Sequence, residues 1–457
     1  MQVKRIPRIM IAAASSGSGK TTLTCGLLQV LLSRGLSVSS FKCGPDYIDP
    51  MFHRKVIGAT SGNLDLFLLG EAGVKRCLGE NAGETDIAVL EGVMGYYDGI
   101  GLTTRSSSYE VARVTKTPVI LLVDCKGMSL SVAALVSGFA RFREDSGIVG
   151  VILNRLSPAL YPQLKDEVER ETGVAVLGYL PKLADCALES RHLGLVTADE
   201  VENLREKLVC LGEALSQTVD VKAILQLAAQ APPLCWEEIP QALAAPVSIG
   251  VARDRAFCFY YEDALDCLAR MGAKLVPFSP LEDKALPQGI SGFILGGGYP
   301  ELYAQKLSQN ASMRESIRHA IENGMPCIAE CGGFLYLGES LTGEDGEEYP
   351  MAGVLPGRGF PTGRLRRFGY QTLVSHEDSL LLGKGESLPA HEFHYYDSTD
   401  NGRGCTAYKA SRQASWECIH VSDTLFAGFP HIHLGGNPDT ARRFLKRCVA
   451  FEKRSKI

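Results

Sequence analysis

Two groups of residues in this sequence have the types and spacing needed for chemistry. The first is a glycine- and serine-rich run at residues 14–21 that ends in Gly-Lys-Thr and matches the phosphate-loop pattern except at its first position. In such a loop, backbone N–H groups surround phosphates, a lysine reaches the β- and γ-phosphates, and a hydroxyl binds Mg²⁺. The run therefore predicts ATP-binding residues, which are Gly17, Ser18, Gly19, Lys20, Thr21 and Thr22.

The second group surrounds Cys331, which lies between an apolar strand-like run and an apparent helix. The glycines after it allow a sharp turn, and the N–H after the cysteine can help to stabilise an oxyanion. Another glycine-rich run, at residues 296–301, can supply a second N–H. Because a thiol is only slightly ionised at neutral pH, a base is needed, and His431 and His433 are the candidates. This arrangement predicts nucleophilic catalysis by Cys331.

Each group has a structural alternative. A strand-to-helix turn can be rich in glycine and serine without binding phosphate, and one cysteine among fourteen is usually a buried apolar residue. The complete Gly-Lys-Thr-Thr sequence and the agreement of strand, glycines and distant histidines around Cys331 favour the functional interpretation. His391 and His394 do not have the spacing of a zinc site.

Acidic and amide side chains come after several predicted strands of the N-terminal half. Ligands of an open parallel sheet collect where its strands end, and Asp46, Glu91 and Asn154 lie at or just after such ends. Because Mg²⁺ prefers hydroxyl and carboxylate oxygens, we expect Thr21, Asp46 and Glu91 to hold Mg²⁺. Asn154 is expected to join the ATP site. The alternative for each of these strand-end residues is a turn or helix cap.

The elements that must position these residues alternate between apolar strands and amphipathic helices, which indicates an α/β fold. We expect two doubly wound, mostly parallel-sheet domains, at residues 1–235 and 246–457, with a linker between them. A helix is predicted at Thr21–Arg34 and another at Tyr260–Met271. The predicted strands are Arg8–Ala13, Ser37–Phe41, Asp86–Leu90, Pro118–Asp124, Ile148–Asn154, Val174–Tyr179, Ser248–Ala252, Lys274–Phe278, Gly292–Leu295 and Pro326–Glu330.

Composition narrows the class of protein. The net charge of −5 gives no electrostatic footprint for nucleic acid or an anionic membrane, so neither partner is expected. The sequence contains no run of eighteen apolar residues, so we expect no membrane span. Residues 1–14 are interpreted as a buried first strand rather than a signal peptide. Fourteen cysteines without paired spacing indicate a reducing compartment, so a cytoplasmic location is expected.

With these residues assembled, the chain resembles the cobyrinate a,c-diamide synthase family of corrin biosynthesis over nearly its whole length. The N-terminal half is similar to dethiobiotin synthetase and the C-terminal half to class I glutamine amidotransferases, so the two sheets are expected to be P-loop NTPase-like and amidotransferase-like. The motifs that carry the resemblance are the phosphate loop and residues 44–50, 63–65, 91–99, 191–195, 256–261, 296–301, 329–333, 367–370 and 391–395.

The resemblance implies a division of labour between the two halves. Glutamine is hydrolysed at Cys331 through a thioester, with His431 increasing the nucleophilicity of the thiol. The ammonia passes to the synthetase domain, where ATP activates the a- and c-acetate carboxylates as acyl phosphates in two successive rounds. The expected partners are a corrinoid or related tetrapyrrole acid, L-glutamine and ATP, and a homodimer is an open alternative. The residues expected to contact the macrocyclic substrate are Lys42, Tyr47, Asp49 and Asp98.

The resemblance also bears on the catalytic base. The usual Cys-His-Glu triad is described as reduced to Cys and His in this family, and His431 lacks the His-Pro-Glu continuation that would supply a third member. His433 remains an alternative base. His431 is preferred because the residues before it align with the strand that precedes the usual catalytic histidine.

Two alternative functions remain open at this point. The first keeps the chemistry but changes the acceptor to hydrogenobyrinate, nickel-sirohydrochlorin or, for a sister group, cobyrate. The second is a P-loop switch ATPase of the partitioning kind. That class has an additional lysine early in its loop, where this chain has Ser15, and a switch would not explain the turn at Cys331.

Overall fold

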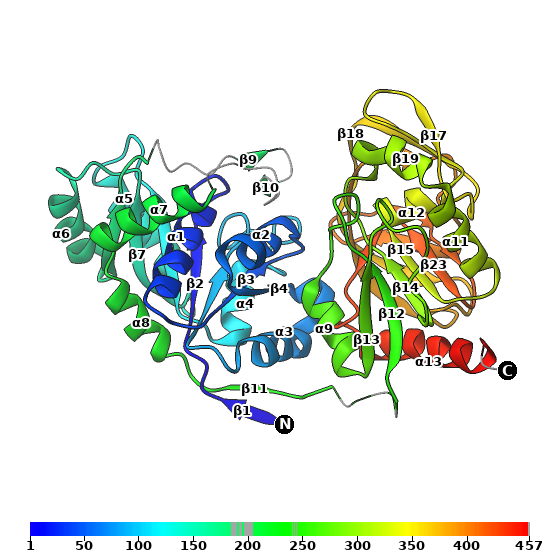
Figure 1. Cartoon of the computed structure of the whole chain (residues 1–457). Coiled ribbons are helices and arrows are strands. Elements are labelled where there is room, and N and C mark those ends of the chain that lie inside the picture. Colours follow the sequence, from blue (N-terminus) through cyan, green and yellow to red (C-terminus); the bar gives the residue numbers. More distant parts are fainter. Residues whose placement is uncertain are drawn as a thin grey trace. The chain divides into compact units, whose positions relative to one another are not determined.

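The chain divides into two compact units, residues 1–238 and 239–457, and each unit has its own sheets and core (Figure 1). The computed structural model describes residues 1–183, 190–191, 194–195, 204–239, 241, 243 and 245–455. Of the motif at residues 191–195, His192 and Leu193 lie outside the described residues. No helix in the described part of the chain is long and apolar enough to cross a membrane.

The first unit is built on a seven-stranded sheet in the order β4-β3-β5-β2-β6-β7-β8, with every neighbouring pair parallel. Six of these strands are the ones that the sequence predicts, and they are confirmed. The edge strand β4 was not predicted, because its Thr-Ser-Gly-Asn-Leu sequence lacks an apolar run. The strands are β2 Arg8–Ala13, β3 Val38–Cys43, β4 Thr60–Leu64, β5 Ile87–Glu91, β6 Val119–Asp124, β7 Ile148–Asn154 and β8 Ala175–Leu180.

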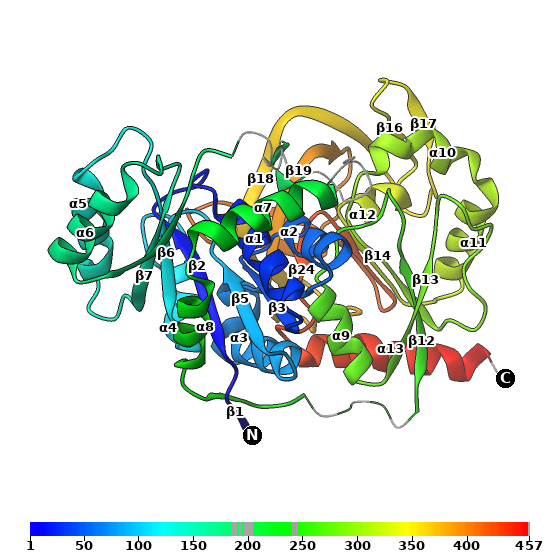
Figure 2. The same ribbon diagram turned by 60° about the vertical axis from the view of Figure 1, so that its left-hand side comes forward.

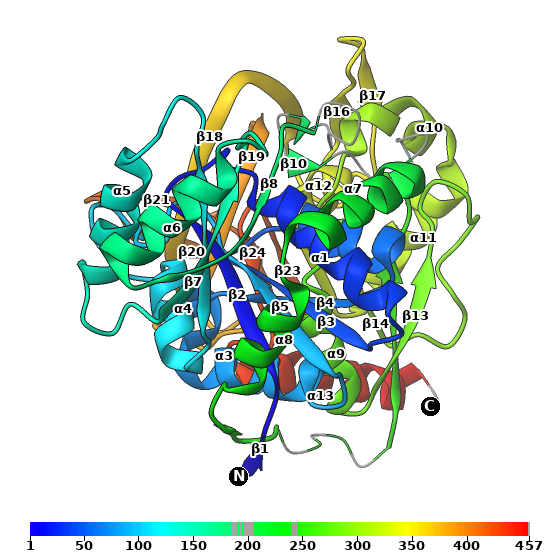
Figure 3. The same ribbon diagram turned by 90° about the vertical axis from the view of Figure 1, so that its left-hand side faces the viewer.

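Helices cover this sheet and set the positions of the loops at its strand ends. The predicted first helix is confirmed as α1, and it packs against α7 so closely that a Cβ at Gly26 would lie 2.9 Å from Leu211 Cγ (Figure 2). Figure 3 shows α5 and α6 side by side next to β7. The helices are α1 Lys20–Ser33, α2 Ile48–Phe52, the π-helix η1 His53–Ile57, α3 Leu66–Ala82, α4 Ser108–Thr115, α5 Ser131–Arg141, α6 Tyr161–Thr172, α7 Leu204–Thr218 and α8 Val221–Ala229.

The first unit also contains two short antiparallel pairs. The strand β1 (Gln2–Lys4), at the N-terminus, pairs with β11 (Leu234–Trp236), so the beginning and end of the unit lie side by side (Figure 1). The strands β9 (Ser190–Arg191) and β10 (Gly194–Leu195) form the other pair.

The second unit contains a six-stranded sheet in the order β13-β12-β14-β15-β23-β22, which is parallel except for its edge strand β22. The four predicted strands occupy its first four positions and are confirmed. The strands are β12 Val247–Ala252, β13 Ala273–Phe278, β14 Gly292–Leu295, β15 Cys327–Glu330, β22 His420–Val421 and β23 Leu425–Gly428.

A second, mostly antiparallel sheet of seven strands was not expected from the sequence. Its long strands are rich in charged and aromatic residues and pair with register shifts near Arg366, so they lack a clean apolar alternation. Its short strand β24 carries His431. The strands are β16 Ser340–Thr342, β17 Glu348–Pro350, β18 Arg358–Ser375, β19 Ser387–Ser398, β20 Cys405–Lys409, β21 Ser415–Cys418 and β24 His431–Ile432.

The helices of the second unit pack on its parallel sheet, with α9 against β13 and α13 against β12. The predicted helix after β12 is confirmed as α9. The helices are α9 Glu262–Arg270, the 3₁₀ helix η2 Pro300–Tyr303, α10 Ala304–Gln309, α11 Ala311–Glu322, α12 Gly332–Leu337 and α13 Pro438–Ser455.

The contact between α3 and β11 gives a stability prediction. A Cβ at Gly79 would lie 2.6 Å from Cε2 of the buried Trp236 indole, whereas one at Gly138 in α5 would meet nothing within 4 Å. We expect Gly79→Ala to lower the free energy of unfolding of this unit by about 1–3 kcal/mol through overpacking. The matched change Gly138→Ala should leave it unchanged or raise it by up to about 1 kcal/mol.

Urea unfolding followed by tryptophan fluorescence checks this pair of variants. The chain has two tryptophans, so a Trp416→Phe background leaves Trp236 as the reporter of the first unit. Equal midpoints for the two variants would contradict the close packing of Gly79 on the indole.

Candidate functional site

The glycine- and serine-rich loop joins the central strand β2 to the start of α1. Gly19 precedes the helix with φ 97°, a conformation that favours glycine. The Lys20 ammonium donates to the Ser15 carbonyl oxygen at 3.0 Å and to the Met94 carbonyl oxygen at 2.6 Å. Burial, and then the nearby Lys42 ammonium, lowers the pKa of Lys20 to about 8. Two backbone carbonyl oxygens therefore hold the Lys20 ammonium beside the loop, where it can contact bound phosphates.

Asn154, at the end of β7, contacts the backbone of this loop. Its Nδ2 donates to the Ser18 carbonyl oxygen at 2.7 Å. A Cβ at Gly19 would lie 2.5 Å from that nitrogen, so the close approach requires glycine. Asn154 therefore fixes the shape of the loop, a role that is compatible with the predicted place beside the nucleotide.

Arg155 is a residue of this site that sequence reasoning did not identify. Its guanidinium donates to the Gly17 carbonyl oxygen at 3.1 Å and to Asp124 Oδ1 at 2.8 Å. The residue has a positive φ of 58°, which is uncommon outside glycine. A cation directly after a strand-end asparagine was the signal in the sequence. Asp124 thus holds a positive charge next to the phosphate loop.

A network of charged groups lies where the metal was predicted. Thr21 Oγ1 donates to Glu91 Oε1 at 2.6 Å, and the Lys42 ammonium contacts the same oxygen at 2.6 Å and Asp49 Oδ2 at 2.5 Å. Glu91 Oε2 is buried and has no hydrogen-bond partner among the described residues. Burial alone would lower the pKa of Lys42, but Asp49 and Glu91 outweigh it and raise that pKa well above its ordinary value. The network is therefore organised around a positive charge.

Asp46 lies beside this network and not within it. Its Oδ1 accepts the backbone N–H groups of Ile48 and Asp49, at 2.8 Å and 3.2 Å, at the start of α2. Burial, and then the charge of Asp49, raises the pKa of Asp46 to about 7. Asp46 is thus a helix cap whose charge depends on pH near neutrality, whereas Asp49, like Glu91, contacts Lys42.

Residues of the phosphate loop and of the charged network line a cavity of about 360 Å³. Ser18, Asn154, Tyr47 and Asp98 are not part of its lining. Asp98 accepts the Gly95 N–H at 3.0 Å and so shapes the loop after β5, and Tyr47 precedes α2. The predicted residues in the lining are Gly17, Gly19, Lys20, Thr21, Thr22, Lys42, Asp46, Asp49 and Glu91.

In the second unit, Cys331 forms the turn between β15 and α12. Its backbone has φ 48°, and its N–H donates to the Gly428 carbonyl oxygen of the neighbouring strand at 2.8 Å. Burial, followed by the charge of Glu301, raises the pKa of the Cys331 thiol well above its ordinary value, although a hydrogen bond from the Gly332 N–H opposes this. The thiol is thus placed for nucleophilic attack but needs a base to ionise it.

The second glycine-rich run packs directly against this turn. Gly333 N–H donates to the Gly296 carbonyl oxygen at 3.0 Å, and a Cβ at Gly333 would overlap the carbonyl of Leu295. A Cβ at Gly332 would lie 3.2 Å from the backbone nitrogen of Gly298. The backbone of both runs therefore meets beside the thiol, in agreement with a role in binding an oxyanion.

His431 contacts both this glycine-rich run and the residue before the cysteine. A Cβ at Gly297 would lie 2.6 Å from His431 Cε1 and 3.4 Å from its Nε2. The other ring nitrogen, Nδ1, lies 3.3 Å from Glu330 Oε2. From the sequence we expected no third acid next to His431. That expectation was wrong, because it considered only residues after the histidine in the chain.

His433, the alternative base, has both ring nitrogens engaged elsewhere. Nε2 is 2.9 Å from Asp263 Oδ2, and Nδ1 accepts the Gly435 N–H at 3.2 Å. The ring stacks on Tyr261 with a centroid separation of 4.9 Å. This arrangement leaves neither nitrogen to accept a proton from Cys331, so His431 is the better candidate.

The motif at residues 391–395 lies on β19, which pairs with the strand that carries His431, and no group of metal-binding side chains occurs in the described part of the chain. His391 pairs with His431 across β19 and β24, and burial, then the nearby His431, lowers the pKa of His391 to about 3. Glu392 is buried and accepts from Gln371 Nε2 at 2.7 Å, while His394 Nε2 lies 2.6 Å from its other oxygen. Both oxygens of Glu392 are therefore engaged by neighbouring side chains.

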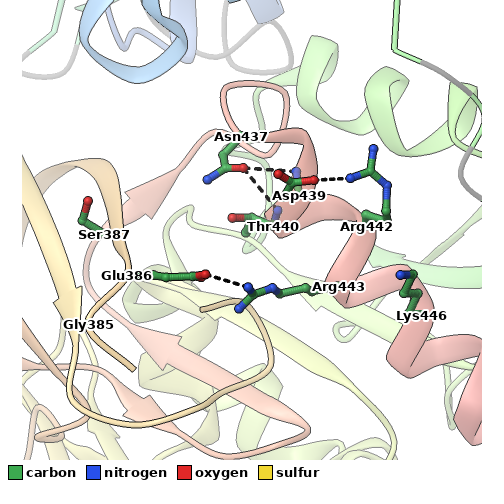
Figure 4. Close-up of a pocket in the computed structure, with 9 residues that line it drawn as sticks. All are labelled: Gly385, Glu386, Ser387, Asn437, Asp439, Thr440, Arg442, Arg443 and Lys446. Carbon is green, nitrogen blue, oxygen red and sulfur yellow. Dashed lines mark hydrogen bonds and ion pairs between the residues drawn. The ribbon is translucent and has the colours of Figure 1, made fainter. Parts of the chain in front are cut away.

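A cavity of about 460 Å³ at the start of α13 has none of these reactive residues in its lining (Figure 4). Two of its basic side chains are in ion pairs, with Arg443 2.7 Å from Glu386 and Arg442 in contact with Asp439. Its lining contains no nucleophile or general base of the kind found at Cys331. We therefore assign no reaction to it.

Comparisons with known proteins match a separate family domain within each of the two units. Residues 9–196 match the CobQ/CobB/MinD/ParA nucleotide binding domain, and residues 248–438 match the CobB/CobQ-like glutamine amidotransferase domain. The chain is 42% identical to a cobyrinate a,c-diamide synthase of Caldanaerobacter subterraneus subsp. tengcongensis, over 97% of this chain and 99% of that protein.

Two further relatives bear the same name. The Listeria innocua protein is 43% identical over 94% of this chain and 97% of its own length. The Thermoplasma volcanium protein is 39% identical over 99% of this chain and all of its own length.

The lowered pKa of Lys20 predicts how nucleotide binding depends on pH. Below pH 8 the ammonium is charged before ATP arrives, whereas above pH 8 it must take up a proton when the phosphates bind. We expect affinity for ATP to fall by up to about tenfold between pH 7 and pH 9. Titration calorimetry at about pH 8.5 in two buffers of different ionisation enthalpy should detect proton uptake.

Lys20→Arg is the matched control, because arginine stays charged throughout this range and should remove the proton uptake. Binding by the wild-type chain with no uptake in that calorimetry would show that the pKa of Lys20 is not lowered.

Proposed function

The chain belongs to the cobyrinate a,c-diamide synthase family, and from that premise we propose how its residues divide the reaction. It is an ATP-dependent, glutamine-hydrolysing ligase that forms amides in cobalamin biosynthesis. The first unit uses ATP to activate a carboxylate of the corrinoid, and the second supplies ammonia from glutamine. The observation that carries this division is the occurrence of a phosphate loop and a cysteine turn in one chain.

Glutamine hydrolysis takes place at Cys331. His431 Nε2 accepts the thiol proton, and the sulfur attacks the side-chain carbonyl carbon of glutamine while backbone N–H groups of the two glycine-rich runs stabilise the oxyanion. The C–N bond breaks, and the proton on His431 goes to the leaving ammonia. Water, deprotonated by His431, then attacks the thioester carbon. The C–S bond breaks to release glutamate, and the proton on His431 returns to the Cys331 sulfur.

Amide formation takes place in the cavity of the first unit. Lys20 and the backbone of its loop bind the phosphates of ATP, and an oxygen of the substrate carboxylate attacks the γ-phosphorus to give an acyl phosphate and ADP. Ammonia then attacks the acyl carbon, phosphate leaves, and the nitrogen loses a proton. The Lys42 ammonium lies where it can balance negative charge on the substrate or the phosphates.

The residues of this cavity fit Mg²⁺. Thr21, Asp49 and Glu91 present hydroxyl and carboxylate oxygens, and the buried Glu91 Oε2 without a hydrogen-bond partner in the described chain suits a cation. When bound, Mg²⁺ would offset negative charge on the β- and γ-phosphates. Of the predicted metal residues, Thr21 and Glu91 fit best, and Asp49 fits better than Asp46, which caps α2.

The division of labour predicts different losses for the two reactive side chains. Cys331→Ala should abolish glutamine-dependent synthesis and leave ammonia-dependent synthesis within about twofold, because ammonia bypasses the thioester. Lys20→Ala should reduce synthesis with either nitrogen source by roughly 10²-fold or more, since phosphate binding is needed in both cases. The rate of ADP release and of amide formation checks both variants.

Loss of ammonia-dependent synthesis in Cys331→Ala, with the fold retained, would count against separate sites. Substantial turnover by Lys20→Ala would contradict its role in phosphate binding.

The acceptor is tested by product mass. Incubation with ATP, glutamine and a panel of tetrapyrrole acids, namely cobyrinate, hydrogenobyrinate, nickel-sirohydrochlorin and cobyrate, should give two successive carboxylate-to-amide mass changes with cobyrinate. Amidation confined to another member of the panel would keep the chemistry but replace the acceptor.

A further inference from the structure

The Glu330 carboxylate is fixed against the segment that carries His431. Glu330 is the last residue of β15, and its register partner in β23 is Gly428. One carboxylate oxygen lies 3.3 Å from His431 Nδ1, and the other accepts the Ile432 N–H at 3.1 Å. Because it contacts both the ring and the next backbone N–H, the carboxylate cannot move independently of the histidine.

The chemistry of these groups determines which ring nitrogen is protonated. An ionised carboxylate can only accept hydrogen bonds, so Nδ1 must carry the proton and the lone pair that can take a proton is on Nε2. The separation of 3.3 Å is slightly longer than an ordinary N–H···O bond.

Gly297 restricts the ring on its other side. A side-chain carbon at this position would lie 2.6 Å from His431 Cε1, so the imidazole packs against the backbone of the glycine-rich run. The ring is thus held between Glu330 and the loop that contributes to the oxyanion site. The ring is therefore restricted from both sides, and Nε2, the nitrogen remote from Glu330, lies 3.4 Å from the position that a Cβ at Gly297 would take, on the side of that loop.

The surroundings of Cys331 create a need for such a partner. Burial and the charges of Glu301, Glu392 and Glu330 raise the pKa of the thiol, so the thiol needs a base close by to take its proton. After proton transfer, a cation would lie on a ring that is only 2% exposed. Burial disfavours that cation unless an opposite charge is close.

We propose that Glu330 is the positioning residue of the glutaminase, acting on Cys331 through His431. It accepts the Nδ1 proton, keeps the lone pair of Nε2 directed to the thiol proton, and stabilises the imidazolium until that proton passes to ammonia. The inference rests on the proposed function and extends its Cys-His pair to three residues. The third acid directly precedes the nucleophile in the chain instead of following the histidine.

The test is Glu330→Gln, which removes the charge of the side chain but keeps its shape. The amide oxygen can still accept the Ile432 N–H, so a purely structural role predicts almost no change. Loss of the charge should instead reduce kcat for glutamine hydrolysis by roughly 10²-fold or more, with little change in KM. Ammonia-dependent synthesis should be unaffected.

The pH dependence of Cys331 alkylation by iodoacetamide gives a readout that a structural role would not move. Without the carboxylate, the imidazolium is less stable and the thiolate forms less readily, so the midpoint of alkylation should move to higher pH by about one unit or more. Direct repulsion between Glu330 and the thiolate acts the other way, but it is the weakest of the charge effects on the thiol. Subtracting the profile of Cys331→Ala removes the signal from other cysteines. Unchanged alkylation and kcat in Glu330→Gln would overturn the proposal.

The neighbouring histidine provides a matched control. Asp263→Asn removes the carboxylate from the His433 pair, which is also buried, and should leave the alkylation midpoint of Cys331 unchanged. An equal shift in both variants would mean that general loss of negative charge or of packing is responsible, and would overturn the specific role of Glu330.

If Glu330→Gln does not fold, Glu330→Asp provides a second test. Glu330→Asp keeps the charge but moves it away from His431 by the length of one methylene. The alkylation midpoint should therefore stay close to the wild-type value, while kcat should fall. An alkylation midpoint of Glu330→Asp shifted by as much as is expected for Glu330→Gln would contradict the proposal. An unaltered kcat in Glu330→Asp would also contradict it. If the wild-type chain hydrolyses no glutamine, the proposed function fails, while the alkylation profiles still decide whether Glu330 acts on the thiol.

Discussion

Both reactive sites depend on a steric constraint at the end of a central parallel strand. At each site the backbone turns sharply into a helix and passes so close to another segment that a side chain cannot fit. A Cβ at Gly19 would collide with Asn154, and one at Gly333 would overlap the carbonyl of Leu295. Since the backbone must come this close at the strand end, glycine there determines the shape of the turn in which an anion can bind. The remaining side chains act on groups whose positions this constraint sets.

The charges around the two sites are arranged in opposite ways. In the first unit, Lys42 is buried with Asp49 and Glu91, so the network is built to accept positive charge near the phosphates. In the second, burial and the nearby carboxylates keep the Cys331 thiol protonated in the absence of substrate. A base held by its own carboxylate then controls when the thiol ionises. This difference suits one site that binds a polyanion and another whose nucleophile should react only on demand.

The parallel core of each unit was predictable, but the second sheet of the C-terminal unit was not. Strands such as Val119–Asp124 are continuous apolar runs that are buried on both faces, and this pattern identifies them directly. By contrast, β18 (Arg358–Ser375) mixes arginine, glycine and aromatic residues and pairs with register shifts. Its stability comes from its partners β19 and β20 and not from its own periodicity. Local sequence therefore carried too little information to define it.

The sequence by itself determined the chemistry of the protein, because the phosphate loop and the cysteine turn are local motifs whose spacing has a direct physical meaning. Only the tertiary structure decided which distant residues complete each site. It favoured His431 over His433 as the base, because the ring nitrogens of His433 are engaged by Asp263 and Gly435. It also brought Glu330 to His431 across 101 positions of the chain. Such pairs depend on strand order and register. No local pattern in the intervening sequence specifies that order or that register.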